Sequence, residues 1–202
     1  QKMATDILGL EYKEIKPKHT FKNTGPTVDG DYICIAPHAS SHAKYWNYEG
    51  GWQAVVDYIN SIGYKAVMIT KEPLGNEWDD SKLGGTLTNV IDKTGDFPLS
   101  ERANDLMNAK AFIGLGSGLS WLSWALGTKT VLISGFSEDW AEMQDCVRIG
   151  SPKGKCSGCF NRLKLDAGDW NWCPDHKGTN RQFECTKEIT SDMVISELKK
   201  FL

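Results

Sequence analysis

The chain has 202 residues, a formal net charge of −3 and a hydrophobic fraction of 40%. This is enough chain for one domain with a sizeable core. The weak negative charge provides no broad electrostatic attraction to nucleic acid or anionic lipid. No apolar run approaches the roughly 20 residues needed to cross a bilayer, and the first residues, QKMATDILGLEYKEIKPKH, carry no export signal. The composition therefore predicts a cytoplasmic protein, and the start at Gln1 predicts that a segment upstream has been removed.

Short apolar runs alternate with amphipathic stretches from residue 31 onward. The predicted strands are residues 31–38, 65–70, 87–92, 111–118 and 130–136. The predicted helices are residues 51–63, 99–109, 119–127 and 191–202. Strands that alternate with helices form right-handed crossovers and a mainly parallel sheet. The fold class predicted is therefore α/β, with a Rossmann-like sheet between flanking helices.

Local features refine this prediction. Ser100 and Ser191 are the expected N-caps of their helices, and Asn104, Asp105 and Asn108 are expected to face solvent. Cys34 lies in the apolar run YICIA and is expected to be a buried thiol, as is Cys146.

A glycine-rich turn, GLGSGLSWLSWALG, joins the predicted strand and helix near residue 115. Gly114, Gly116 and Gly118 alternate with other residues, and Ser117 and Ser120 are interleaved. Free amides at a helix start attract phosphate, and glycine allows its close approach. The spacing is neither the dinucleotide fingerprint nor a Walker loop, so a tight turn without a ligand is the alternative.

Two further loops follow strands whose carboxyl ends are expected to meet at the same edge of the sheet. In PHASSHAKYW, Ser40 and Ser41 offer hydroxyl donors and Lys44 a positive charge suited to pyrophosphate. The alternative is a solvated loop whose Trp46 packs on the next helix. In KEPLG, Glu72 is able to accept hydrogen bonds from a ribose diol. His38 and His42 are weighed as general bases, but no orienting partner is recognisable for either.

Four of the six cysteines lie between residues 156 and 185, in a polar stretch, residues 150–188, that breaks the α/β pattern. Cys156 and Cys159 form a C-x₂-C pair, and Cys173 and Cys185 follow singly. Four thiolates so spaced fit a closed, tetrahedral structural site for iron or zinc. Two disulfides, a redox pair, or His176 in place of one thiolate are the alternatives.

The chain resembles the C-terminal half of the lipopolysaccharide heptosyltransferases in the order of its elements and motifs. That order is strand, SS-x-x-K-x-W, helix, strand, Glu, strand, G-x-G-x-G-L-S-x-L, helix, GTKTVLISG. The similarity covers about residues 30–145. It implies a GT-B architecture, in which two Rossmann-like domains face a cleft. It also implies that Lys44 and the amides of Gly116, Ser117, Gly118, Leu119 and Ser120 contact a diphosphate, and that Glu72 contacts the ribose. The family commonly has Asp-Thr-Gly where this chain has Gly116-Ser117-Gly118, so the acidic residue's role does not carry over.

The cysteine segment, CVRIGSPKGKCSGCFN, and the chain start are similar to a sister family, the bacterial autotransporter heptosyltransferases, which carry a tetracysteine iron finger. That resemblance covers nearly the whole chain. It implies a donor-binding domain over residues 1–202 with a structural metal at Cys156, Cys159, Cys173 and Cys185, iron being favoured. It further implies transfer of heptose from ADP-heptose to serine hydroxyls of an adhesin. The acceptor domain and the general base would lie outside this chain, which alone would be inactive.

A binding module is the rival class of function. A metal knuckle is able to recognise a protein partner or nucleic acid without any transferase activity, although the chain has no basic cluster around its cysteines. The tryptophans at 121, 124 and 140 fit a buried helix or a homo-oligomer surface equally well.

Overall fold

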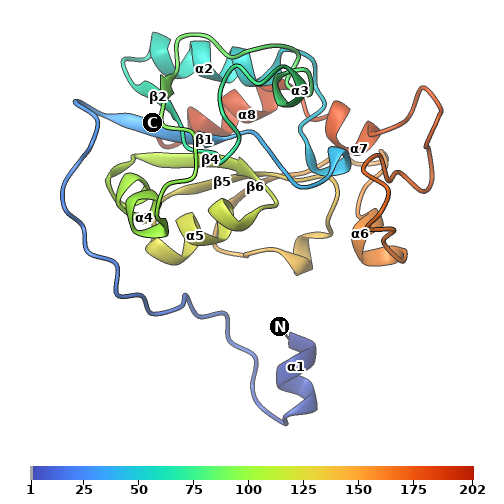
Figure 1. Ribbon diagram of the computed structural model, residues 1–202. Helices are drawn as coiled ribbons and strands as arrows, with labels where there is room; N and C mark the ends of the chain where they lie inside the picture. The colour runs from blue at the N-terminus through green and yellow to red at the C-terminus, as the bar shows by residue number, and fades with distance from the viewer. Residues whose placement is uncertain (1) are drawn as a thin grey trace.

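A computed structural model describes residues 2–202, and within them all strands belong to one parallel sheet (Figure 1). The sheet order is β3-β2-β1-β4-β5-β6. The strands are β1 (Tyr32–Ala36), β2 (Lys65–Met68), β3 (Ile91–Asp92), β4 (Ala111–Leu115), β5 (Thr130–Ile133) and β6 (Val147–Ile149). This confirms the predicted α/β class and adds β6, which the sequence pattern did not reveal.

The strand order reverses between β1 and β4, which pair in parallel with Ile33 opposite Ala111 and Ala36 opposite Gly114. The chain builds outward from β1 through β2 to β3, and then from β4 through β5 to β6. Loops leaving β1 and β4 therefore diverge to opposite faces of the sheet. Such a switch point opens a crevice at the carboxyl ends of the strands, where α/β proteins bind ligands.

Helices cover both faces of the sheet. Figure 1 shows α2 (Gly51–Ser61) and α8 (Ser191–Leu198) on one side, and α4 (Leu99–Asn108) and α5 (Gly118–Leu126) on the other. The side chains of β1 alternate between these layers: Ile33 and Ile35 pack in the α2/α8 cluster, whereas Tyr32 and Cys34 pack in the α4/α5 cluster. Every β1 residue is buried because both faces are covered.

The remaining elements are short. They are α1 (Lys2–Ile7), η1 (His42–Lys44), α3 (Glu77–Asp80), η2 (Asp139–Ala141), α6 (Cys159–Arg162) and α7 (Glu184–Lys187). Two predicted N-caps are wrong: Pro98 precedes α4, and the Thr190 hydroxyl caps α8 by accepting from the Met193 amide. No helix of residues 2–202 is long and apolar enough to cross a membrane.

The predicted solvent exposure of α4 is also wrong. Asn104 and Asp105 are buried, and Asn108 is half-buried, because the segment before β1 runs along the outer side of this helix. The Asn104 side chain accepts from the Thr24 amide at 2.8 Å, and the Asp105 carboxylate accepts from the Thr27 hydroxyl at 2.7 Å. Contacts between residues so far apart in the chain leave no trace in the helical periodicity.

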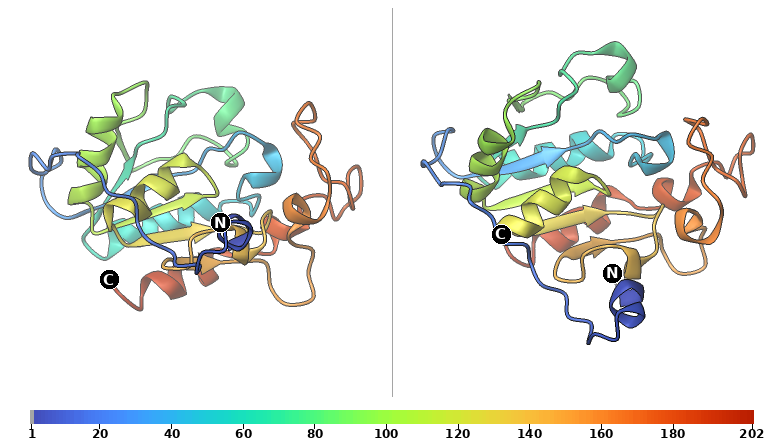
Figure 2. Two further views of the ribbon diagram at one scale, coloured as in Figure 1. Left: turned by 90° about the horizontal axis from the view of Figure 1, so that it is seen from below. Right: turned by 60° about the horizontal axis from the view of Figure 1, so that its bottom comes forward.

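The N-terminal part of the chain, before the segment that runs along α4, forms an arm outside the sheet layers. Figure 2 shows the arm leading from α1 toward β1. It touches the body where Lys16 pairs with Asp145 at 3.0 Å and where Glu14 accepts from the Gln144 amide.

Candidate functional site

A cleft of about 510 Å³ lies at the switch point, where three strand-end loops converge. Its lining residues come from the ends of β1, β2 and β4: His38, Ala39, Ser40, Lys44, Thr70, Lys71, Glu72, Gly116, Ser117, Gly118, Leu119 and Trp121. The structure thus brings together most of the residues singled out in the sequence. Thr70, Lys71 and Trp121 complete the lining; the first two follow β2 directly, and Trp121 lies one turn into α5.

The lysine loop, residues 37–47, supplies the positive charge on one side of the cleft. It forms the short 3₁₀ helix η1, at whose end the Lys44 ammonium lies 3.4 Å from the Ser40 hydroxyl. Ser41 does not line the cleft, because its hydroxyl donates to the Trp170 carbonyl at 3.4 Å. Trp46 is buried and packs edge-on against Trp52 of α2 at 5.4 Å, as the structural alternative anticipated.

The glycine loop, residues 114–118, presents the start of α5 to the same cleft. Ser117 occupies the N-cap position in extended conformation. Within the described part of the chain, the amides of Gly118 and Leu119 donate to no protein acceptor, as expected for a first helical turn. Ser120 is buried, and its hydroxyl donates back to the Leu115 carbonyl, so it shapes the loop and does not line the cleft. The helix start therefore offers open donors and its positive dipole end to an anion.

Glycine is required at 114 by close packing. A Cβ there would lie 2.6 Å from the Phe112 ring and 3.0 Å from the Ser120 hydroxyl. At Gly116 a Cβ would lie 3.3 Å from Oε1 of Glu142. That buried carboxylate accepts from the Ser134 hydroxyl at 2.6 Å and pairs with Arg148 at 2.7 Å. A charge-balanced pair thus supports the glycine loop from behind, a feature with no local sequence motif.

His38 and Glu72 form the third wall. The Thr70 hydroxyl donates to the Glu72 carbonyl, so it accepts from Nδ1–H of His38 at 3.1 Å. Burial lowers the pKa of His38, with the Glu72 carboxylate 3.8 Å away opposing the shift. The expectation that His38 lacks an orienting partner is wrong. The half-exposed Glu72 carboxylate remains available to a ligand.

The finger, residues 150–188, lies beyond the carboxyl ends of the strands and includes α6 and α7 (Figure 1). All six cysteines of the chain are free thiols. Ligand atoms of Cys156, Cys159 and Asp175 lie within 4.8 Å of one another. Cys173 packs in the same apolar cluster as Cys156 and Cys159. Burial, followed by the charges of those three cysteines, raises the pKa of Cys185 to about 12. Cys173 and Cys185 lie near the pair but outside the group of ligand atoms that the described residues bring within 4.8 Å.

The two thiols and the carboxylate gathered here are donor types that suit iron or zinc. Crowded, buried thiols hold their protons unless a cation balances the thiolates. The Phe183 amide donates to Cys173 Sγ at 3.5 Å. Asp175, and not His176, is the residue gathered beside the C-x₂-C pair in the described chain, and it is held by Arg162 at 2.9 Å.

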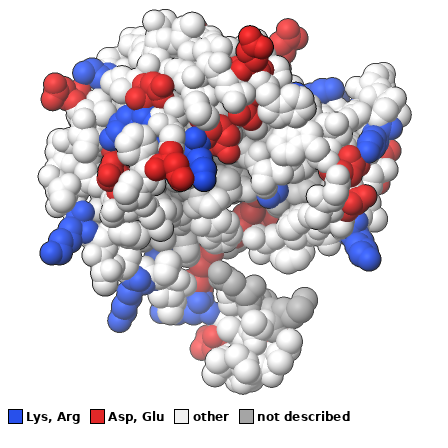
Figure 3. Space-filling view, in the orientation of Figure 1, with Lys and Arg blue, Asp and Glu red and all other residues white. Residues whose placement is uncertain are grey.

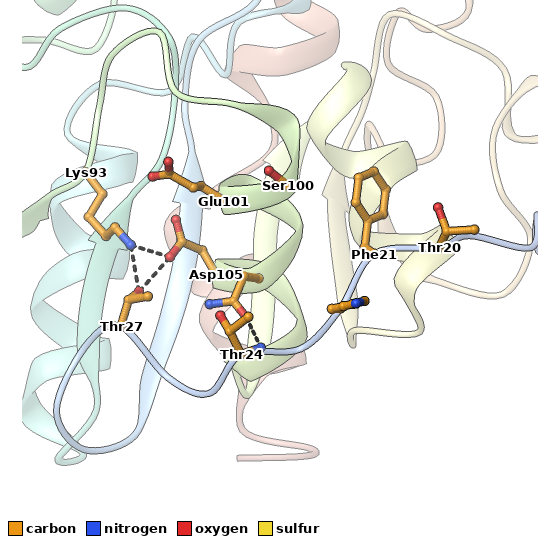
Figure 4. Close-up of a pocket in the computed structure, with 10 residues that line it drawn as sticks. Thr20, Phe21, Thr24, Thr27, Lys93, Ser100, Glu101 and Asp105 are labelled. Atoms are coloured by element: carbon orange, nitrogen blue, oxygen red, sulfur yellow. Dashed lines mark hydrogen bonds and ion pairs between the residues drawn. The ribbon is translucent and has the colours of Figure 1, made fainter.

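A second cavity, of about 540 Å³, lies beside α4 (Figure 4). Its wall includes the segment Thr20–Thr27, and Lys93 and Asp105 project toward Thr27. Their polar groups pair with one another: Lys93 donates to Thr27 at 2.6 Å and pairs with Asp105. These contacts hold the segment before β1 against α4. The cleft at the switch point, by contrast, presents open donors.

Fold and cleft define a GT-B-like α/β domain of the glycosyltransferase class. A model of glycosyltransferase family 9 (heptosyltransferase) matches residues 3–162. The chain belongs to this family.

Comparison with curated relatives shows which members of the family the chain is similar to. The chain is 42% identical to the autotransporter heptosyltransferase BAHTCr of Citrobacter rodentium over 193 residues. This alignment covers 93% of this chain and 46% of that protein. It is 39% identical to the autotransporter heptosyltransferase TibC of Escherichia coli, over 96% of this chain and 47% of TibC. It is 30% identical, over 95% of this chain and 45% of that protein, to BimC of Burkholderia thailandensis, which is described as an inactive autotransporter heptosyltransferase. The chain spans about half the length of the curated relatives it matches.

Solved structures agree with the fold. The dodecameric, iron-containing TibC in complex with ADP-D-β-D-heptose superposes with a TM-score of 0.84 at 39% identity, over 96% of this chain and 51% of that chain. The E. coli heptosyltransferase WaaC with ADP-2-deoxy-2-fluoro heptose gives a TM-score of 0.59 at 15% identity, over 98% of this chain and 53% of that chain. The second likeness concerns the fold alone.

Proposed function

We propose that this chain is the donor-binding half of a protein O-heptosyltransferase, with ADP-heptose as the donor and serine hydroxyls of an autotransporter adhesin as the acceptor. The observation that carries the proposal is the convergence of Lys44, the open α5 amides and Glu72 in one cleft at the switch point. The TibC complex with ADP-D-β-D-heptose, a relative of 39% identity, supports the choice of donor.

In the proposed complex the diphosphate lies between Lys44 and the amides of Gly118 and Leu119. The Glu72 carboxylate accepts hydrogen bonds from the ribose hydroxyls, and His38 with Thr70 fixes the backbone that carries it. Ser40 adds a hydroxyl donor beside Lys44. Leu119 and Trp121 give the cleft apolar surface next to the helix start.

The reaction follows from this placement. The acceptor oxygen attacks the sugar's anomeric carbon while the bond to the ADP oxygen breaks, and the electron pair leaves with the diphosphate. Lys44 and the helix-start dipole stabilise the charge that develops there. The hydroxyl proton passes to a general base, which we place on a second domain of the full-length enzyme. No metal ion is needed at the phosphates in this scheme.

The finger would hold its metal through Cys156, Cys159, Cys173 and Cys185. Such an ion supplies folding energy to a polar segment that cannot build its own core. Iron is favoured because the related TibC is described as iron-containing. Free thiols at a metal site fit a reducing compartment, and we propose the bacterial cytoplasm.

A nucleic-acid module is the weaker alternative. Basic and acidic side chains are interspersed over the face shown in Figure 3, around α2, α3 and the finger. A nucleic-acid surface would instead gather basic residues on one side.

Calorimetric titration tests donor binding. The chain is titrated with ADP-heptose, ADP and adenosine. Both diphosphates should bind more tightly than adenosine, because Lys44 and the helix start contact only the phosphates. Equal affinity for ADP and adenosine would refute the proposed site.

A further inference from the structure

The lysine loop is fastened to the finger along its outer side. The His42 amide donates to the Trp170 carbonyl at 3.1 Å, and His42 Nδ1–H donates to Asn171 Oδ1 at 2.9 Å. Tyr45 meets the Trp170 ring edge-on at 6.0 Å. The Asn47 amide group donates to the Thr186 hydroxyl at 2.9 Å. Contacts therefore run from one end of the 3₁₀ turn to the other.

These contacts lead directly to the thiol cluster. The His42 ring packs on the Phe183 ring with centroids 4.5 Å apart, and the Phe183 amide donates to Cys173 Sγ at 3.5 Å. Ala43 is buried in the same apolar cluster as Cys159 and Cys173. Lys44, next in the chain, faces the cleft instead. One turn of 3₁₀ helix thus has the finger on one side and the cleft on the other.

The finger also holds the loop after β5. The Gly158 amide donates to the Gly135 carbonyl at 3.0 Å, and a Cβ at Gly135 would lie 2.0 Å from the Cys185 carbonyl oxygen. Gly135 borders a small space shared with Lys44 and Gly116. The finger therefore contacts both the lysine loop and the loop after β5, which borders the same small space as Lys44 and Gly116.

We propose that the finger positions the phosphate-binding lysine of the cleft, and that His42, bound to Asn171 and Phe183, is the positioning residue that transmits this support. The proposal rests on the proposed function, since it assigns Lys44 to the donor diphosphate. His42 is not a base in this role: burial lowers the pKa of the ring, so the neutral ring donates from Nδ1 to Asn171.

The physical advantage is preorganisation. A lysine side chain loses up to about 2 kcal/mol of conformational entropy when it is fixed, and a mobile loop would add a backbone cost. A loop already held in its binding conformation avoids the latter part of that cost. Weakening the support should therefore weaken phosphate binding and leave nucleoside binding unchanged.

The test compares ADP and adenosine affinity by calorimetry in four single variants: Asn171→Ala, Asn171→Asp, His42→Ala and Gln182→Ala. Asn171→Ala removes the acceptor for His42 at an exposed position, so the fold should be retained. Asn171→Asp keeps an acceptor oxygen and should restore affinity. Gln182→Ala, the matched control, removes an amide side chain of the finger whose one partner within residues 2–202 is the Gly178 amide. Asn171→Ala should bind ADP about five- to tenfold more weakly, as expected for loss of one hydrogen bond, with unchanged adenosine affinity and metal content.

The outcomes separate the two proposals. If the wild-type chain binds ADP no better than adenosine, the proposed function fails and this inference falls with it. If the wild type prefers ADP but Asn171→Ala and His42→Ala both retain that preference, only the inference is overturned. Equal losses for ADP and adenosine, or an equal loss in Gln182→Ala, would indicate a general structural effect and would also overturn it.

Discussion

Lys44 carries the clearest residue-scale prediction. Lys44→Ala should lower ADP affinity by about one to two decades, because a charge-assisted phosphate contact contributes roughly 1.5–3 kcal/mol. Lys71→Ala is the matched control, since Lys71 also lines the cleft but pairs with Asp96 at 3.4 Å. Calorimetry with ADP and adenosine measures both variants. A larger loss of ADP affinity in Lys71→Ala would mean that Lys71, and not Lys44, contacts the phosphate.

Asp105 carries a prediction about stability. Its buried carboxylate balances Lys93 and Arg102 and accepts from Thr27. Asp105→Asn should lower the free energy of unfolding by about 3–5 kcal/mol, because it leaves the buried Arg102 and the half-buried Lys93 without their counter-charge.

Asp31→Asn is the control for Asp105. Asp31 pairs with Lys110 at 3.4 Å on the surface, where removal should cost less than about 1 kcal/mol. Urea unfolding of both variants provides the comparison. Equal destabilisation would mean that the buried cluster contributes no more than a surface ion pair.

At the scale of elements, the sequence could predict features that depend on neighbouring residues. It could not predict those that depend on contacts between residues far apart in the chain. The glycine turn and α5 follow from neighbouring residues, so their place at the cleft was predictable. The burial of Asn104 was not, because its partner Thr24 lies 80 positions away. The same holds for His42 and Asn171, which are 129 positions apart.

Residues assigned to one loop can also have opposite orientations. Ser40 lines the cleft, whereas Ser41 bonds to the finger. The expected contact of Ser120 is through its amide, but that amide donates to the Ser117 carbonyl at 3.2 Å, and the side chain is turned into the protein. Sequence spacing places such residues at the correct edge of the sheet; only packing decides which side chain faces the cavity.

The finger carries the element-scale prediction. Purified protein should contain about one iron or zinc ion per chain, and Cys156→Ser should lower metal content and solubility because an incomplete tetrahedral site loses both affinity and folding energy. Cys146→Ser is the control, because Cys146 packs near Met143 outside the finger. Elemental analysis decides the question. Absence of metal together with two disulfides by mass spectrometry would contradict the prediction.

At the scale of the whole molecule, the proposed function assigns the described cleft to the donor. The cleft contains a lysine, open amides and a carboxylate, and both histidines have structural partners, Thr70 for His38 and Asn171 for His42. The tryptophans at 121, 124 and 140 differ in their surroundings: Trp124 is buried, Trp121 lines the cleft and Trp140 is exposed. Trp140 therefore remains a candidate for an assembly surface.

This chain alone should bind the donor without transferring sugar. The reason is that the chain spans about half the length of its curated relatives, and we place the general base on the second domain of the full-length enzyme. Incubation with ADP-heptose and a serine-bearing adhesin segment, followed by mass spectrometry, should show no heptose increment. Transfer at the rate of a full-length enzyme would place the base within these residues, and His38 and His42 would become the first candidates.

Hydrogen exchange with and without ADP tests the location of the site most directly. Amide protection should rise at residues 39–44, at residues 70–72 and at residues 116–121, the ends of β1, β2 and β4 that meet in the cleft. The cavity beside α4, bordered by residues 20–27, should be unaffected. Protection confined to that second cavity, or none at saturating ADP, would contradict the assignment of the switch-point cleft as the donor site.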